Sequence, residues 1–165
     1  LGDVYKRQVD NRELLGVLCR YSKEPLLIQQ YADGEEFGAD IYVDLISKKP
    51  VAIFTKKKVR MRAGETEKSI SVKDPALFEL IEKTVSALSL AGPIDMDIFR
   101  IDGKYYISEI NPRFGGGYPH AWHCNVRFPE LIAKNLLGEE NESQIGAYEA
   151  DMCMMKYSDE IVRKL

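Results

Sequence analysis

The sequence predicts an α+β fold in which a mainly antiparallel sheet is flanked by helices. Two strand-like runs, residues 37–46 and 51–59, are joined by a short polar turn. Residues 95–111 carry an Asp-Gly turn between β-branched and aromatic residues, which is typical of a hairpin. Two capped helix patterns lie around these strands, and the short connections favour antiparallel neighbours.

The first part of the chain predicts a helix followed by a strand. Apolar residues recur at helical spacing between Asn11 and Tyr21, and Asn11 is a suitable N-cap. Residues 26–31 are then predicted to form a strand. Residues 3–8 resemble the translation of a transposon adapter used to prepare sequencing libraries. We therefore expect residues 1–8 to be an assembly artefact at the start of a fragment.

The middle of the chain predicts a loop and then the clearest helix. Residues 60–73 have no hydrophobic period and are expected to form a mobile loop. Asp74 and Pro75 suit the cap and first turn of a helix that Gly92-Pro93 ends. Its predicted buried residues are Phe78, Ile81, Val85 and Leu88.

The C-terminal part predicts a helix from Pro129 to Leu137, closed by Gly138, and a strand from Ala147 to Met155. His120 and His123 are expected to line a substrate pocket or lie on the surface rather than bind metal. Trp122 and Phe128 are expected in a core or a pocket wall.

Acidic residues gather on the predicted hairpin. Because side chains alternate along a strand, Asp95 and Asp97 share one face, as do Ile107, Glu109 and Asn111. A three-residue loop would point the four polar side chains the same way. A two-residue loop would turn Glu109 away from Asp97, since one step of register reverses every side chain. We predict the three-residue loop because it also sends a set of apolar residues into one core: Met96, Ile98 and Ile110.

Carboxylates so close together need a cation or a proton. Two unit charges about 4 Å apart repel by about 4 kcal/mol at an effective dielectric near 20. Oxygen-only ligands suit Mg²⁺, with Mn²⁺ as an alternative, and leave positions for substrate phosphates. The ordinary alternative is a solvated acidic strand face.

Three blocks in this order resemble ATP-grasp enzymes of the carbamoyl-phosphate synthase large chain and biotin carboxylase type. Residues 27–37 are similar to the hinge strand that holds adenine, residues 62–70 to the loop that closes near the triphosphate, and residues 97–113 to the metal-binding end. The similarity runs from about Leu26 to Gly138. The pattern departs at Gln29, where the family commonly has an acid, and at Asp97, where Glu or Gln is usual.

The resemblance implies an ATP-grasp C-terminal lobe over residues 31–165 and a remnant of the lid and hinge over residues 9–30. It implies metal ligands at Asp97, Glu109 and Asn111. Arg113 and Asn111 are the implied catalytic residues, and Arg113 would steady the acyl phosphate. The expected nucleotide contacts are Gln29, Gln30, Tyr31, Ala32, Asp40, Arg60 and Arg62.

Several of these residues can also have an ordinary structural role. Asp40 can be an ordinary exposed carboxylate, Arg113 can make a plain salt bridge, and Gly115-Gly116-Gly117 can be a tight turn rather than a site of close substrate approach. The basic run from Lys56 to Arg62 can be a solvated face, although two guanidinium forks would suit a polyphosphate.

The implied function is an ATP- and magnesium-dependent ligase that joins a carboxylate to an amine, or to a thiol, through an acyl phosphate. Two alternatives remain open: a phosphotransferase of the same superfamily acting on a hydroxyl group, and a non-catalytic nucleotide- or metal-binding module. The family's two ATP-contacting lysines would precede Val9. We therefore expect this polypeptide alone to bind ATP weakly and to be inactive.

Composition narrows the partners further. The 165 residues, 45% of them hydrophobic, suffice for one core. With 23 basic and 26 acidic residues and a net charge of −3, a dedicated nucleic-acid binder is not expected. There is no apolar run of membrane-spanning length, and three scattered cysteines suit a reducing cytoplasm. The expected partners are ATP and small carboxylate and amine substrates.

Overall fold

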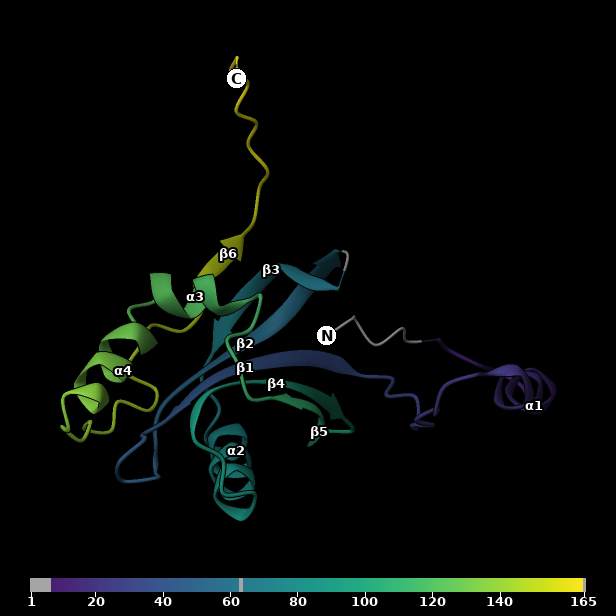
Figure 1. Ribbon diagram of the computed structural model, residues 1–165, viewed down its shortest axis with the longest axis horizontal. Helices are drawn as coiled ribbons and strands as arrows, with labels where there is room; N and C mark the ends of the chain where they lie inside the picture. Colours follow the sequence, from purple (N-terminus) through teal and green to yellow (C-terminus); the bar gives the residue numbers. More distant parts are fainter. Residues whose placement is uncertain (1–6, 63, 165) are drawn as a thin grey trace. The chain divides into compact units, whose positions relative to one another are not determined.

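The computed structural model describes residues 7–62 and 64–164 and divides the chain into two units after Asp33 (Figure 1). In chain order the elements are α1 (Arg12–Tyr21), β1 (Glu35–Val43), β2 (Pro50–Arg62), β3 (Glu65–Val72), α2 (Pro75–Ala87), β4 (Gly92–Ile101), β5 (Lys104–Asn111), α3 (Tyr118–His123), α4 (Phe128–Leu136) and β6 (Cys153–Met155).

The first unit contains α1. The predicted cap is confirmed, because the backbone N–H of Leu14 donates to Asn11 Oδ1 at 2.8 Å. The strand predicted at residues 26–31 is wrong: the segment has no regular secondary structure, and Leu27 is 89% exposed. A strand needs a paired neighbour, and the strands of the described sheet all come from the second unit. Leu1–Lys6 lie outside the described residues, so the adapter origin stays a prediction.

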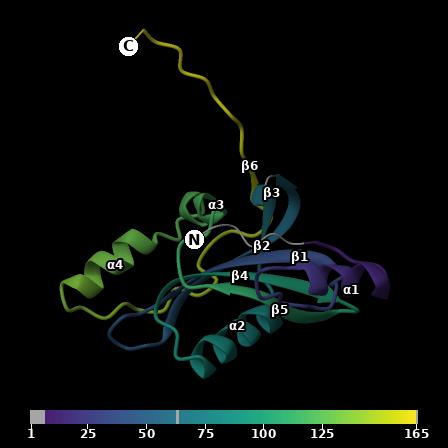
Figure 2. The same cartoon turned by 45° about the vertical axis from the view of Figure 1, so that its right-hand side comes forward.

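The second unit is built on a six-stranded sheet in the order β5-β4-β1-β2-β3-β6, and every pairing is antiparallel (Figures 1 and 2). Helix α2 lies on one face, and α3 and α4 lie on the other (Figure 2). The predicted α+β class, with a mainly antiparallel sheet flanked by helices, is therefore confirmed.

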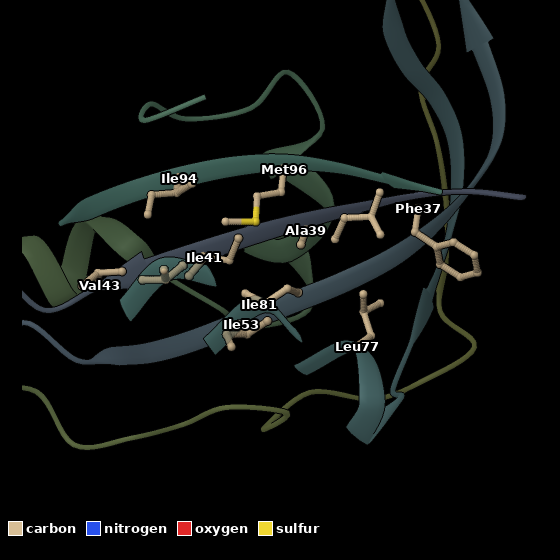
Figure 3. Close-up of a cluster of buried hydrophobic side chains, with 11 residues drawn as sticks. Phe37, Ala39, Ile41, Val43, Ile53, Leu77, Ile81, Ile94 and Met96 are labelled. Atoms are coloured by element: carbon tan, nitrogen blue, oxygen red, sulfur yellow. The ribbon is translucent and has the colours of Figure 1, made fainter. Parts of the chain in front are cut away.

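The face under α2 is an apolar core (Figure 3). Alternate residues of β1 and β4, together with Ile53 of β2, pack there against residues of the helix: Leu77, Ile81 and Val85. Asp74 caps α2 as predicted, since its Oδ1 accepts the backbone N–H of Ala76 at 2.9 Å. Leu88 was expected in this core but is 54% exposed, because α2 ends one residue before it.

The opposite face is apolar at one end only. There Tyr42 and Phe54 pack against Ala121 of α3 and Phe128 of α4. The predicted helix at residues 129–137 is confirmed within one residue at each end, and Gly138 follows it with φ 84°. Helix α3 was not predicted, and the predicted last strand is reduced to three residues, β6. Within the described residues, no helix has the length and apolar character needed to cross a membrane.

The mobile loop predicted at residues 60–73 is wrong for most of its described part, because residues 60–62 and 65–72 belong to strands. Strand β2 continues to Arg62, Gly64 turns the chain with φ 79°, and β3 returns to Val72. The buried positions of β3 are Thr66, Ser69 and Ser71. Because these inward residues carry hydroxyl groups, the strand shows no hydrophobic period in the sequence.

Candidate functional site

The β4–β5 hairpin brings the predicted acidic residues together by an unpredicted route. Ile101 pairs with Lys104, so the loop has two residues, Asp102 and Gly103, both with positive φ. The predicted three-residue loop is therefore wrong. A register shift then follows, because Asp97 pairs with Glu109 while Ile98 pairs with Ile107.

The bulge at Ser108 supplies the step of register that the loop lacks. Asp97 lies opposite Glu109 and Asp95 opposite Asn111, as the sequence predicted. Ile107 was expected on the face of Glu109, but it packs with Ile110 against the α2 core. The shared face of the hairpin is thus correct near its polar end only.

Neighbouring strands extend this polar surface. Asp40 of β1 pairs with Asp95, and Gly38 pairs with both Asp97 of β4 and Lys56 of β2. Cross-strand partners point to the same face of a sheet. The resulting polar patch consists of Glu36, Asp40, Lys56, Lys58, Asp95, Asp97, Glu109 and Asn111.

The side chains of two lysines of the patch are buried, which excludes for them the solvated face that was the alternative for the basic run. Lys56 is 1% exposed and forms an ion pair with Asp40, which is equally buried. Lys58 Nζ lies 2.6 Å from Asp97 Oδ1 and 2.8 Å from Glu36 Oε1. Burial opposes the charge on Lys58, but Asp97 and Glu36 outweigh it and raise its pKa. Alternation along β2 was the sequence signal that could have separated Lys56 and Lys58 from Lys57.

Asp95 of β4 lies between two cross-strand partners of the polar patch, Asp40 of β1 and Asn111 of β5. Burial, followed by the charges of Asp40 and Asp97, raises the pKa of its carboxyl group. Arg113 Nη1 donates to Asp95 Oδ2 at 3.1 Å and also to the carbonyl oxygen of Phe114 at 2.9 Å. The structure therefore gives Arg113 a salt bridge, and its side chain remains 57% exposed.

The glycine run covers the patch closely. A Cβ atom on Gly115 would lie 2.5 Å from Asp95 Oδ1, and one on Gly117 would lie 2.8 Å from Lys56 Nζ. Neither residue has a positive φ, so small size rather than an unusual backbone conformation requires glycine here.

His120 is buried beside the patch rather than on the surface. Its Nδ1 lies 2.8 Å from Ser69 Oγ, and its ring packs edge-on against Phe54. Burial and the nearby charge of Lys56 lower its pKa to about 4. His120 is therefore neutral at physiological pH and joins α3 to β3.

The other predicted nucleotide residues are not members of the polar patch. Arg60 and Arg62 are exposed and form ion pairs with Glu67, at 2.7 and 3.3 Å. Gln29, Gln30, Tyr31 and Ala32 belong to the first unit. Their nucleotide-binding roles stay predictions.

The donor chemistry at the end of the hairpin fits a hard cation. Glu109 and Asn111 lie together, with Asn111 Nδ2 donating to Glu109 Oε1 at 3.2 Å. One buried oxygen nearby, Asp40 Oδ1, has no hydrogen-bond partner. The described part of the chain contains no group of three or more His, Cys, Asp or Glu side chains arranged to hold a metal. A magnesium ion here would depend on Asn111 and on substrate phosphates as well.

Residues 22–159 match the family described as ATP-grasp in the biosynthetic pathway with Ter operon. No curated protein matches this chain by sequence. Solved structures share its fold at low identity. The biotin carboxylase–β,γ-ATP complex from Campylobacter jejuni has a TM-score of 0.58 and 13% identity, and the match covers 76% of this chain and 30% of that one.

Two further structures agree in fold. The biotin carboxylase domain of a thermophilic 2-oxoglutarate carboxylase bound to bicarbonate has a TM-score of 0.57 and 12% identity, covering 75% of this chain and 30% of its own. A pyruvate carboxylase from Rhizobium etli with acetyl coenzyme A has a TM-score of 0.54 and 12% identity, covering 72% and 13%. This chain thus spans only a part of the relatives it matches. The likeness to ATP-grasp enzymes predicted from three sequence blocks is confirmed.

Proposed function

The chain belongs to the family of ATP-grasp proteins in the biosynthetic pathway with Ter operon, and from that premise we propose that it carries the phosphate and magnesium site of an ATP-dependent ligase. The reaction is the joining of a carboxylate to an amine through an acyl phosphate, with a thiol as the other acceptor. The supporting observation is the pairing of Asp97 with Glu109 and of Asp95 with Asn111 on one face, next to two buried lysines.

The contacts of these residues support separate roles in magnesium binding and phosphoryl transfer. Glu109 and Asn111 supply oxygen donors for magnesium, with Asp97 directly opposite on β4. Magnesium, when bound, neutralises charge that develops on the β- and γ-phosphate oxygens. Arg113 lies at the end of β5 with an exposed guanidinium group, so it can leave Asp95 for the transferred phosphoryl group.

The protein's own charges would hold the triphosphate in place. Lys56 and Lys58 give the polar patch fixed positive charge without the mobility of surface lysines. Asp40 holds Lys56 in place. We assign the adenine to Gln29, Gln30, Tyr31 and Ala32, and the outer phosphate contacts to Arg60 and Arg62, on the family likeness alone.

The test is ADP formation by the intact protein with ATP, magnesium and a panel of carboxylates, with hydroxylamine present to trap acyl phosphate as hydroxamate. ADP and hydroxamate in equal amounts are expected. ADP formed with a hydroxyl compound and no hydroxamate would instead indicate a phosphotransferase. ATP binding with no ADP from any substrate would indicate a non-catalytic module.

A matched pair of variants connects the activity to the site. Glu109→Gln keeps the size of the side chain but removes its charge, and we expect ADP formation to fall about 100-fold or more. Glu79→Gln is the control, because Glu79 is exposed on α2, over the other face of the sheet. Equal rates in both variants would contradict the assignment of Glu109.

A further inference from the structure

Lys58 crosses a whole strand to reach its main partner. It belongs to β2, while Asp97 belongs to β4, and β1 lies between them. The crossing occurs at Gly38, where a Cβ atom would lie 3.3 Å from Lys58 Cε and 3.1 Å from Lys56 Cε. A side chain at Gly38 would therefore push against both lysine stems.

The lysine side of this contact is shielded from water, whereas the side chains of Asp97 and Glu36 are 23% and 28% exposed. The Lys58 side chain is 5% exposed, and its ammonium group bonds to Asp97 Oδ1 and Glu36 Oε1 at 2.6 and 2.8 Å. Charge-assisted hydrogen bonds of this length are strong when buried. A divalent ion bound directly to Asp97 would sit close to this ammonium group and be repelled by it.

We propose that the Lys58 ammonium group takes the place of a second metal ion beside Asp97, so that the site binds a single Mg²⁺ through Glu109 and Asn111. Asp97 then acts through Lys58 as a positioning residue and is not a direct metal ligand. The proposal rests on the proposed function and specifies the number of metal ions that this site takes.

The experiment counts Mn²⁺ ions bound to the intact protein with a non-hydrolysable ATP analogue, from the free Mn²⁺ signal in electron paramagnetic resonance. One ion per chain above that bound by the analogue alone is expected. In Lys58→Met the repelling charge is gone and Asp97 and Glu36 lack their cation, so two ions are expected. Lys57→Met is the control, because Lys57 forms an ion pair with Glu35 and its side chain points to the opposite face of the sheet from that of Lys58. It should bind one ion.

A second comparison does not need Lys58→Met to fold. Asp97→Asn should leave Mn²⁺ affinity within about twofold, while Glu109→Gln should weaken it at least about tenfold, because losing a direct ligand costs no less than losing an outer-shell partner. Equal weakening by both variants would overturn the proposal.

The number of ions bound distinguishes the role of Lys58 from the proposed function. Two ions bound by the wild-type protein, or one ion still bound by a folded Lys58→Met, would overturn the role of Lys58 and leave the proposed function intact. No Mn²⁺ bound by the wild-type protein would contradict both.

Discussion

The two faces of the sheet are made from alternate residues of the same strands, yet they bury opposite chemistry. Under α2, Ile41, Met96 and Ile98 are fully buried among other apolar side chains. On the other face, Asp40 and Lys56 are just as deeply buried, but as an ion pair. One residue along β1, from Ile41 to Asp40, separates the two environments.

The two faces of the sheet contribute differently: the apolar face stabilises the fold, and the polar face is better explained by function. Apolar burial contributes roughly 25 cal/mol per Å² removed from water. A buried ion pair adds little net stability, although removing one partner costs a great deal. The polar patch is therefore poorly explained by stability, whereas a site for phosphates and magnesium needs fixed charge shielded from water.

The largest effect is expected from breaking the buried ion pair. Lys56→Met leaves Asp40 buried without its cation and should lower the free energy of unfolding by about 4 kcal/mol, measured by urea denaturation. The double variant Lys56→Met/Asp40→Leu should recover most of this loss, since no charge is then left unpaired. A double variant as unstable as the single one would show that the pair itself stabilises the fold.

The apolar face should respond differently. Ile98→Ala should lower the free energy of unfolding by about 3 kcal/mol, because a cavity remains in the α2 core. Nucleotide and Mn²⁺ affinity of the folded variant should stay unchanged. Altered metal affinity at temperatures where the variant is fully folded would show that the two faces are coupled.

The glycine run should show an intermediate effect. Gly115→Ala places a methyl group against Asp95 and should cost about 2 kcal/mol of stability, within the range of overpacked sites. Gly116→Ala is the matched control, because its added methyl group would meet only the flexible end of Glu65, at 3.3 Å. Equal unfolding midpoints for the two variants would contradict the requirement for small size at Gly115.

The carboxyl groups of Asp44 and Asp95 should contribute to the free energy of unfolding with opposite pH dependence. Burial opposes the charge on Asp44, but hydrogen bonds from Asn135, Ser47 and Asn141 outweigh it and hold its pKa well below 3.8. Its contribution to stability is present above pH 3.8 and is lost as the pH falls. Asp95 has a raised pKa in the folded protein. Its contribution to stability is therefore present below pH 3.8 and is lost as the pH rises through that folded-state pKa.

Asp44→Asn should therefore flatten the loss of stability in acid, while Asp95→Asn should steepen it. Urea denaturation over the acid range measures both slopes. Slopes that change in the same direction would contradict the opposite shifts of these pKa values.

The smallest effect is expected at the exposed arginines. Glu67→Gln removes the acid that pairs with Arg60 and Arg62, and it should change stability by less than about 1 kcal/mol. If these arginines contact phosphates, freeing them should leave ATP affinity equal or higher. A fall in affinity, measured by calorimetry, would contradict that role.

Local rules were enough for the capped helices and for the pairing of the acidic residues. Asn11 and Asp74 accept backbone N–H groups within their own helices, so neighbouring residues contain the whole signal. For Asp97 and Glu109 the prediction was right although its reason was wrong, because the two-residue loop and the bulge at Ser108 offset each other. The sorting of polar from apolar side chains constrains the final register more tightly than it constrains the loop.

The sequence by itself determined which residues carry charge, where α1 and α2 begin and which strands form the acidic hairpin. The tertiary structure alone decided that the side chains of Lys56 and Lys58 are buried, that β3 is a strand and that Gly115 and Gly117 must be small. Each of these depends on a partner distant in sequence: Asp40 and Asp97 for the lysines, His120 for Ser69, and Asp95 for Gly115. Burial and ion pairing are set by what lies across the sheet, and a local pattern of residues does not contain that neighbour.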